Sequence, residues 1–161
     1  MLTDVIKMEK YKLNFELVPD GCWYTNLRSA LSPQQWDRVR FDAYRRAKGR
    51  CMICGAPTKR LEAHERWSYD EQKALQTLQT VIAVCRPCHE VIHIGRAQLF
   101  GRGMDAMEHF MRVNECSQME FHQALGQANE EHKARNKIDS WTTDISWLKD
   151  NFDILPPFSI K

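Results

Sequence analysis

The sequence predicts an α+β protein, with a small core of two strands and one helix that is held by metal and flanked by further helices. Two Cys-x-x-Cys turns, at 51–54 and 85–88, enclose a pair of segments with strand character. Helix-capping signals occur before and after this region. We expect one compact unit with an N-terminal strand and helix, the core, and a C-terminal helical extension, at residues 1–50, 51–96 and 97–161.

The N-terminal part predicts one strand and one helix. The segment KLNFELV (12–18) alternates apolar and polar residues and stops at a Pro-Asp-Gly turn signal. Ser32 can cap a helix, and Gln35 completes a capping box. We expect that helix to run to about Lys48.

In the core, the sequence predicts a hairpin followed by a short helix. Residues 59–70 and 74–85 have strand character, and the polar residues 71–73 can join them. The helix that follows has Pro87 near its start and Gly95 past its expected end.

In the C-terminal extension, the sequence predicts two more helices. One covers about 104–113, and the other begins at a capping box formed by Ser117 and Glu120 and runs to about Lys137. The tail beyond has several aromatic residues, so we expect it to pack an apolar strip on the body. These helices could brace the core, mediate a dimer or dock a partner protein.

Composition and charge limit the classes of function. No run of eighteen apolar residues exists, and the first ten residues lack the apolar segment of a secretory signal, so we expect a cytoplasmic protein without a membrane span. The net charge of +2 does not by itself indicate nucleic acid. Residues 36–60 are basic, however, whereas residues 113–161 carry more acidic than basic side chains.

Four cysteines predict a structural zinc site. In a reducing compartment they are not expected to form disulfides. Each Cys-x-x-Cys turn offers two thiolates at the spacing that tetrahedral zinc requires, and closure of the hairpin would bring the two turns together. The expected ligands of the structural Zn²⁺ are Cys51, Cys54, Cys85 and Cys88.

Three histidines predict a second metal site. His89 and His93 lie four residues apart on the expected helix, so they share one face. His64, within LEAHERW on the first strand, is the candidate for the third ligand. The second ion would be divalent, with Mg²⁺, Mn²⁺, Ni²⁺ or Zn²⁺ as candidates.

Residues 51–93, with CMIC, LEAHE and CRPCHEVIH, resemble the HNH endonucleases of the ββα-metal (His-Me finger) class. The form they resemble has a core braced by four zinc-binding cysteines. The resemblance covers about 43 of the 161 residues, which is the span from 51 to 93. It implies a ββα-metal core and a metal-dependent endonuclease that hydrolyses DNA.

The resemblance also implies roles for individual residues. His64 matches the strand ligand of the catalytic ion, and His89 and His93 match the helix ligands. In the family, a histidine after the strand ligand activates water, and an asparagine near the start of the second strand supports it. Glu65 and Thr80 stand at these two positions here.

Two assignments of the catalytic base stay open. In the first, Glu65 is the base, with a pKa raised by burial from about 4.3. Because Glu65 follows His64 directly on a strand, it reaches the same site only if a bulge or strand end redirects it. In the second, Glu62, His89 and His93 bind the ion and His64 is the base, because Glu62 and His64 share a strand face.

Basic side chains around the core predict contacts with DNA phosphates, which Lys and Arg bind without reading sequence. Arg66 is the first candidate, and the others are Arg45, Arg60 and Arg96. No motif for reading a groove is present, so we expect low sequence specificity. The alternative function is a zinc-braced binding or regulatory protein on an HNH scaffold, for nucleic acid or protein, with little or no cleavage.

Overall fold

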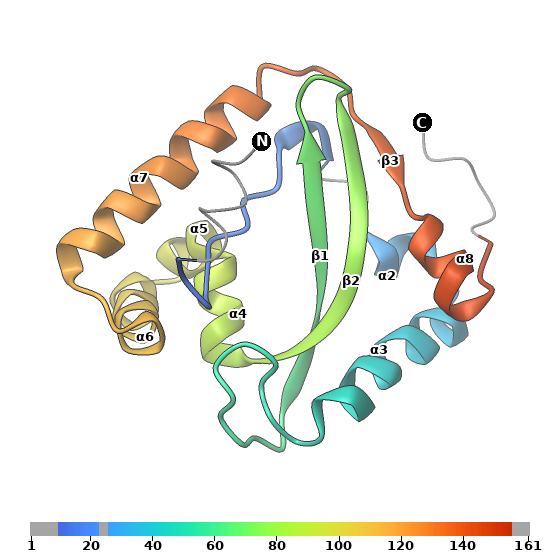
Figure 1. Ribbon diagram of the computed structural model, residues 1–161, viewed down its shortest axis with the longest axis horizontal. Helices are drawn as coiled ribbons and strands as arrows, with labels where there is room; N and C mark the ends of the chain where they lie inside the picture. Colours follow the sequence, from blue (N-terminus) through green and yellow to red (C-terminus); the bar gives the residue numbers. More distant parts are fainter. Residues whose placement is uncertain (1–9, 23–25, 156–161) are drawn as a thin grey trace.

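A long antiparallel β-hairpin runs through the centre of the fold (Figure 1). The computed structural model describes residues 10–22 and 26–155. β1 (Leu61–Asp70) and β2 (Leu75–Cys85) pair along their lengths, as the sequence predicts. A short third strand, β3 (Thr142–Asp144), pairs in parallel with the start of β2, so β1 is an edge strand of the sheet.

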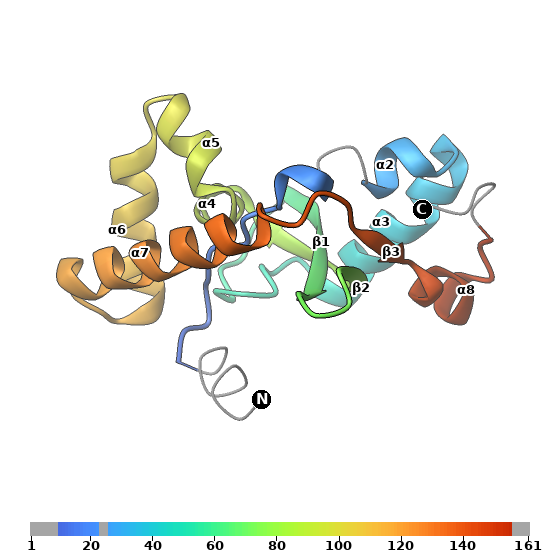
Figure 2. The same ribbon diagram turned by 90° about the horizontal axis from the view of Figure 1, so that it is seen from above.

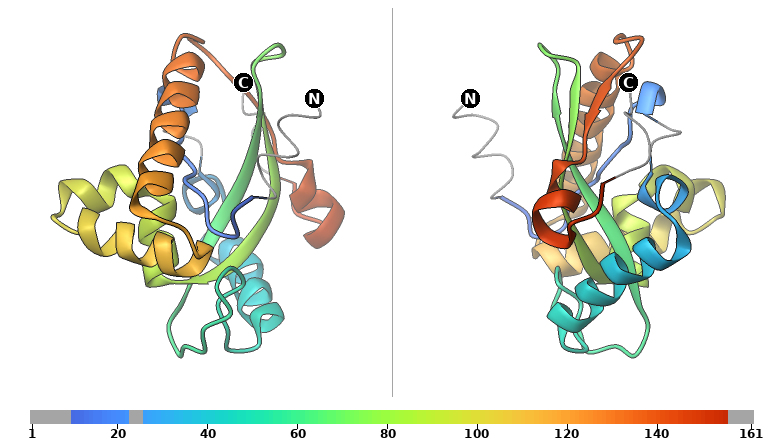
Figure 3. Two further views of the ribbon diagram at one scale, coloured as in Figure 1. Left: turned by 60° about the vertical axis from the view of Figure 1, so that its left-hand side comes forward. Right: turned by 90° about the vertical axis from the view of Figure 1, so that its right-hand side faces the viewer.

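Helices lie on both sides of the hairpin, as Figures 2 and 3 show from other directions. One layer consists of α4 (Arg86–Ile92), α5 (Ile94–Leu99), α6 (Gly103–Asn114) and α7 (Gln118–Arg135). The other consists of α2 (Leu27–Ala30), α3 (Pro33–Ala47) and α8 (Ser146–Phe152). A 3-10 turn, η1 (Asp20–Cys22), precedes α2. The predicted α+β class is therefore confirmed, and no helix of the described ranges is long and apolar enough to span a membrane.

Each face of the hairpin packs against its own apolar core. Ile82 and Val84 of β2 lie in the first core, together with Phe110 of α6. Val81 and Ala83, which alternate with them, lie in the second core with α3 and α8. Burial of both faces specifies the register, because a shift of one residue would exchange the two sets of side chains.

Both predicted capping boxes are present. In α3 the hydroxyl of Ser32 accepts a hydrogen bond from the Gln35 N–H at 3.2 Å, and the Gln35 side chain accepts one from the Ser32 N–H at 3.0 Å. Ser117 and Glu120 form the same pair of bonds at the start of α7. These bonds satisfy backbone donors that the first helical turn would otherwise leave unpaired.

The predicted N-terminal strand is wrong. Residues 10–18, here called the strap, lie along α4, α6 and α7 without joining the sheet. The strap's alternation instead buries Leu13 and packs Phe15 and Leu17 against the first core. The Asn114 side chain bonds both the N–H and the C=O of Leu13, so a side chain replaces the neighbouring strand.

One expectation for the end of a helix is corrected, and the expected packing of the C-terminal tail is confirmed. Gly95 was expected beyond the helix that starts near Pro87, but the chain turns at His93 and continues as α5, which includes Gly95. In the C-terminal tail, the expected apolar packing is present, since Leu148 and Ile154 are buried in the second core. The sequence pattern did not reveal that this tail also forms β3 and α8.

We expect Ser32→Ala to lower the free energy of unfolding by about 1 kcal/mol, because the first turn of α3 loses its side-chain acceptor. Urea denaturation of the two proteins measures this difference. Ser32→Asp keeps an acceptor at the same position and should stay close to the parent. Equal midpoints for Ser32→Ala and the parent would show that the cap contributes nothing.

Candidate metal centres

The two Cys-x-x-Cys turns meet at the open end of the hairpin. Pairing of Leu61 with Cys85 places the end of β2 beside the start of β1, and the turn at 51–54 lies just before β1. The sulfur atoms of the four cysteines lie within 4.8 Å of one another. Tetrahedral zinc with Zn–S bonds of about 2.3 Å requires sulfurs about 3.8 Å apart, and Cys54 and Cys85 Sγ are separated by 3.7 Å. The cluster is close enough to hold a metal ion, as predicted.

Backbone hydrogen bonds shape the first cysteine turn. The Met52 N–H donates to the Ala83 carbonyl at 3.0 Å, which attaches the turn to β2. The Ile53 N–H points at Cys51 Sγ at 3.4 Å, an orientation that stabilises a thiolate. Gly55 has φ of +77°, a left-handed conformation that favours glycine and closes the turn.

Crowding of the four sulfurs makes their protonation interdependent. Hydrogen bonds from Cys85 and Cys88 lower the pKa of Cys51, and the same contact with Cys51 raises the pKa of Cys85 to about 12 and that of Cys88 as well. One thiolate is therefore stabilised at the expense of its neighbours. A divalent cation offsets this repulsion and binds all four as thiolates, which is the chemistry of a structural zinc site.

One histidine near this cluster was not expected there. The Nε2 atom of His109, in α6, lies 3.2 Å from Cys88 Sγ. Burial lowers the pKa of His109, so the neutral ring can donate an N–H to the sulfur. No spacing in the sequence connects α6 to the cysteines, so only the packing of α6 on α4 reveals this contact.

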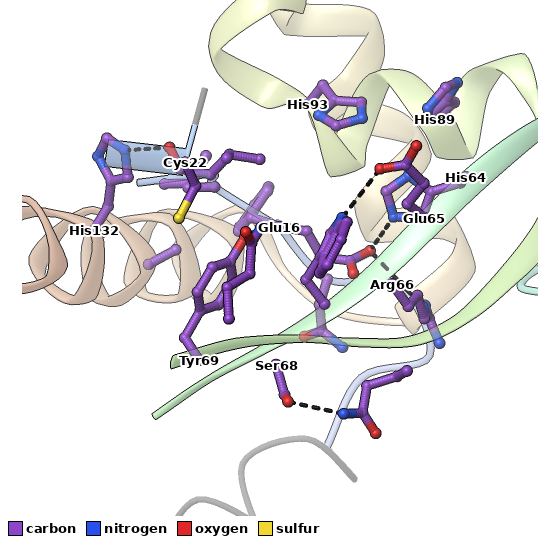
Figure 4. A pocket seen from close by; sticks show the side chains of 18 of the residues that line it. Glu16, Cys22, His64, Glu65, Arg66, Ser68, Tyr69, His89, His93 and His132 are labelled. Carbon is purple, nitrogen blue, oxygen red and sulfur yellow. Dashed lines mark hydrogen bonds and ion pairs between the residues drawn. The ribbon is translucent and has the colours of Figure 1, made fainter. Parts of the chain in front are cut away.

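The three predicted histidines come together beside the cysteine cluster. His64 projects from β1, and His89 and His93 project toward it from α4 and its C-terminal end (Figure 4). One ligand nitrogen from each ring lies within 4.8 Å of the others, and the ring centroids are 4.9 to 5.4 Å apart. Three imidazoles in this arrangement are a donor set for a divalent transition metal.

Burial keeps the helix histidines neutral. It lowers the pKa of His93 to about 4 and also lowers the pKa of His89, with the neighbouring His64 adding to both effects. A neutral imidazole has a free lone pair on one ring nitrogen, which is the form that binds metal. His89 and His93 can therefore bind a cation without first losing protons near neutral pH.

Two carboxylates contact the histidine cluster. Glu62 Oε2 lies 2.6 Å from His89 Nδ1, and Glu16 Oε2 lies 2.9 Å from His64 Nε2. Glu62 and His64 were expected on one strand face, and this contact agrees with that placement. Glu16 comes from the strap, 48 residues before His64. Sequence reasoning missed Glu16, since no periodicity or motif links the strap to the core.

Glu65 lies on the opposite face of the hairpin from His64. Regular pairing continues through Arg66, and the bulge between Arg66 and Trp67 comes too late to redirect Glu65. Its carboxylate accepts hydrogen bonds from the Leu27 N–H at 2.8 Å and from Trp67 Nε1 at 3.2 Å. Burial raises its pKa. The expectation that Glu65 acts as the base is therefore corrected, because its carboxylate connects α2 and β1 on the other face.

The remaining candidate residues, one threonine and four arginines, lie in different parts of the fold. Thr80 pairs with Arg66 across the hairpin, and its hydroxyl contacts the Val81 carbonyl. Arg66 and Arg96 line the same groove as the three histidines. Arg45 belongs to α3 on the other face and pairs with Asp42, so it does not join them. Arg60 is an exposed residue just before β1.

Comparison of the chain with protein-family models, with curated proteins and with solved structures found no match. The assignment of function therefore depends on the chain's own residues and on their geometry.

We expect Cys88→Ser to lose bound zinc and to unfold. Structural zinc contributes about 10–16 kcal/mol in small zinc peptides, which is as large as the whole stability of about 5–15 kcal/mol of a typical domain. Metal analysis by mass spectrometry and circular dichroism of the purified variant measure both effects. Cys116→Ser lies outside the cluster and should keep zinc and fold. A folded, zinc-free Cys88→Ser protein would refute the structural role of this site.

We expect Glu65→Ala to lower the free energy of unfolding by about 1–3 kcal/mol, because the Leu27 N–H and Trp67 Nε1 lose their acceptor. Its metal content should not change. Denaturation and metal analysis of the variant test this, with the exposed Glu108→Ala as control. If Glu65→Ala instead kept the stability of the parent and lost a bound metal ion, Glu65 would have to belong to a metal site.

Proposed function

We propose that the protein is a metal-dependent endonuclease of the HNH type that hydrolyses DNA phosphodiester bonds with low sequence specificity. The observation that carries this proposal is the convergence of three imidazoles from a strand and from the helix that follows the hairpin. The strand, helix and four-cysteine cluster occur in the order that the resemblance to zinc-braced HNH endonucleases requires. The closeness of the three imidazoles in space adds support that the order along the chain does not give.

His64, His89 and His93 would hold a second divalent ion. When bound, such an ion supplies a Lewis acid for the phosphate, a charge partner for the leaving 3′ oxygen and a lower pKa for the attacking water. The three rings would supply three ligands from one strand and from one helix and its C-terminal end. Further coordination positions of such an ion would be left for water and phosphate.

Arg66 is suited to orient the scissile phosphate. It follows His64 by two residues, so it shares the strand face of that histidine. Its buried Nε makes no hydrogen bond within the described structure and lies 3.8 Å from Glu16 Oε2. The Arg66 side chain is 37% exposed, so its other guanidinium N–H groups would be available to a phosphate oxygen.

Arg96 lies next to the helix ligands and would contribute a second positive charge. It belongs to α5, three residues after His93, and its guanidinium lies 6.0 Å from the Phe100 ring. Contacts from Arg96 and Arg66 would hold the DNA backbone without reading bases, which supports low sequence specificity.

A binding or regulatory role on the same scaffold is the second candidate. The observation that favours it is the orientation of Glu65, which leaves the family's base position without a side chain at the histidines. Thr80 also contacts its own strand and not the site. Such a protein would bind metal and nucleic acid or a partner protein, and would cleave little or no DNA.

We expect the purified protein to nick supercoiled plasmid in the presence of Mg²⁺, Mn²⁺, Ni²⁺ or Zn²⁺ and not in EDTA. His89→Ala should reduce nicking to background, because it removes a ligand of the second ion. Gel electrophoresis of the plasmid measures the reaction. His122→Ala, an exposed histidine outside the cluster, is the matched control and should cleave like the parent. Absence of cleavage with every ion, from protein that retains its zinc, would contradict the nuclease and favour the binding role.

A further inference from the structure

We propose that Glu16 is a positioning residue for His64 and that the C-terminal helices hold it there through the strap. The inference rests on the proposed second metal site and deepens it. Glu16 Oε2 lies 2.9 Å from His64 Nε2, which makes it a hydrogen-bond acceptor for that nitrogen (Figure 4). The group of close ligand atoms found in the described residues contains the three histidines and not Glu16. Glu16 is therefore placed to orient His64 by accepting its N–H.

The strap is held in register at several points along its length. The Glu16 N–H donates to the Ile92 carbonyl at 3.0 Å, next to His93. Asn114 at the end of α6 bonds the backbone of Leu13 at 3.0 and 2.8 Å. His132 of α7 contacts the Val18 carbonyl at 3.1 Å. Glu16 lies between these anchors, which fix its backbone beside the histidine cluster.

Apolar packing fixes the same segment. The Phe15 ring is stacked on Phe110 of α6, with centroids 5.0 Å apart and planes 3° from parallel. Leu13 is fully buried. Because successive residues of an extended chain point to opposite sides, the packing of Phe15 on Phe110 directs Glu16 away from α6 and toward β1. The C-terminal extension thus determines where a carboxylate meets the proposed metal site.

Two histidines of the cluster have the same kind of partner. Glu62 contacts His89 at Nδ1, and Glu16 contacts His64 at Nε2. A carboxylate that accepts the N–H of one ring nitrogen leaves the lone pair of the other nitrogen for a metal and fixes the direction of the ring. The pairing would leave Nδ1 of His64 and Nε2 of His89 to hold an ion. The two negative charges also offset part of the charge of a dication.

To test this inference, the whole protein with its structural zinc is titrated with Co²⁺. Visible absorption and calorimetry measure the affinity of Co²⁺ binding. Loss of an outer-shell carboxylate typically lowers metal affinity by about 10–100-fold. We expect Glu16→Ala to weaken Co²⁺ binding by this amount. Glu16→Gln should fall between Glu16→Ala and the parent, because its amide oxygen still accepts the bond without the negative charge. Asn14→Ala, on the same strap, is the control and should bind like the parent.

A second pair of variants tests the path through the strap. Asn114→Ala should weaken Co²⁺ binding although Asn114 lies outside the site. The loss should disappear in the Glu16→Ala background, because both substitutions then act through one carboxylate. Nitrogen-15 NMR of the imidazoles reports which ring nitrogen carries the proton, and a general loss of stability does not change this. His64 should be protonated at Nε2 in the parent and lose this preference in Glu16→Ala.

The outcomes separate this inference from the proposed function. If the parent binds no Co²⁺ beyond its zinc site, or if His89→Ala binds Co²⁺ as tightly as the parent, there is no second metal site at the histidines. The inference then fails together with the proposed function. If the parent binds Co²⁺, His89→Ala abolishes that binding and Glu16→Ala leaves it unchanged, then only the role of Glu16 is overturned. Unchanged affinity with loss of plasmid nicking in Glu16→Ala would also overturn it, because Glu16 would then act in the reaction and not on a ligand.

Discussion

The register of the β1–β2 hairpin is the constraint on which the rest of the structure depends. Pairing of Leu61 with Cys85 brings the two cysteine turns together, and the same register directs His64 toward α4. A shift of one residue would move His64 to the face that packs against α3. Apolar side chains on both faces of β2 oppose such a shift, since each set fits a different core.

Helix α4 links the two candidate metal centres. Cys88 belongs to the cysteine cluster, and the next residue, His89, belongs to the histidine cluster. An ion at the cysteines would therefore fix the start of the helix whose following turn presents His89 and His93. The two candidate centres meet in a segment of nine residues, from Cys85 to His93, because α4 and its two end residues carry members of both clusters.

The outer elements have a role beyond covering the cores. Helices α6 and α7 hold the strap, and the strap brings Glu16 to the histidines. On the other face, Glu65 bonds the start of α2 to the hairpin. The consecutive residues His64 and Glu65 of β1 thus contact different elements, because successive side chains of a strand point to opposite faces.

The sequence by itself determined the local features of this protein. Spacing and periodicity predicted the hairpin, the capped helices, the meeting of the cysteines and the faces shared by His89 with His93 and by Glu62 with His64. Only the tertiary structure decided the orientation of Glu65, the contact of His109 with Cys88 and the arrival of Glu16 at His64. Periodicity describes residues a few positions apart on one element, whereas these contacts join segments that only the packing of whole elements brings together.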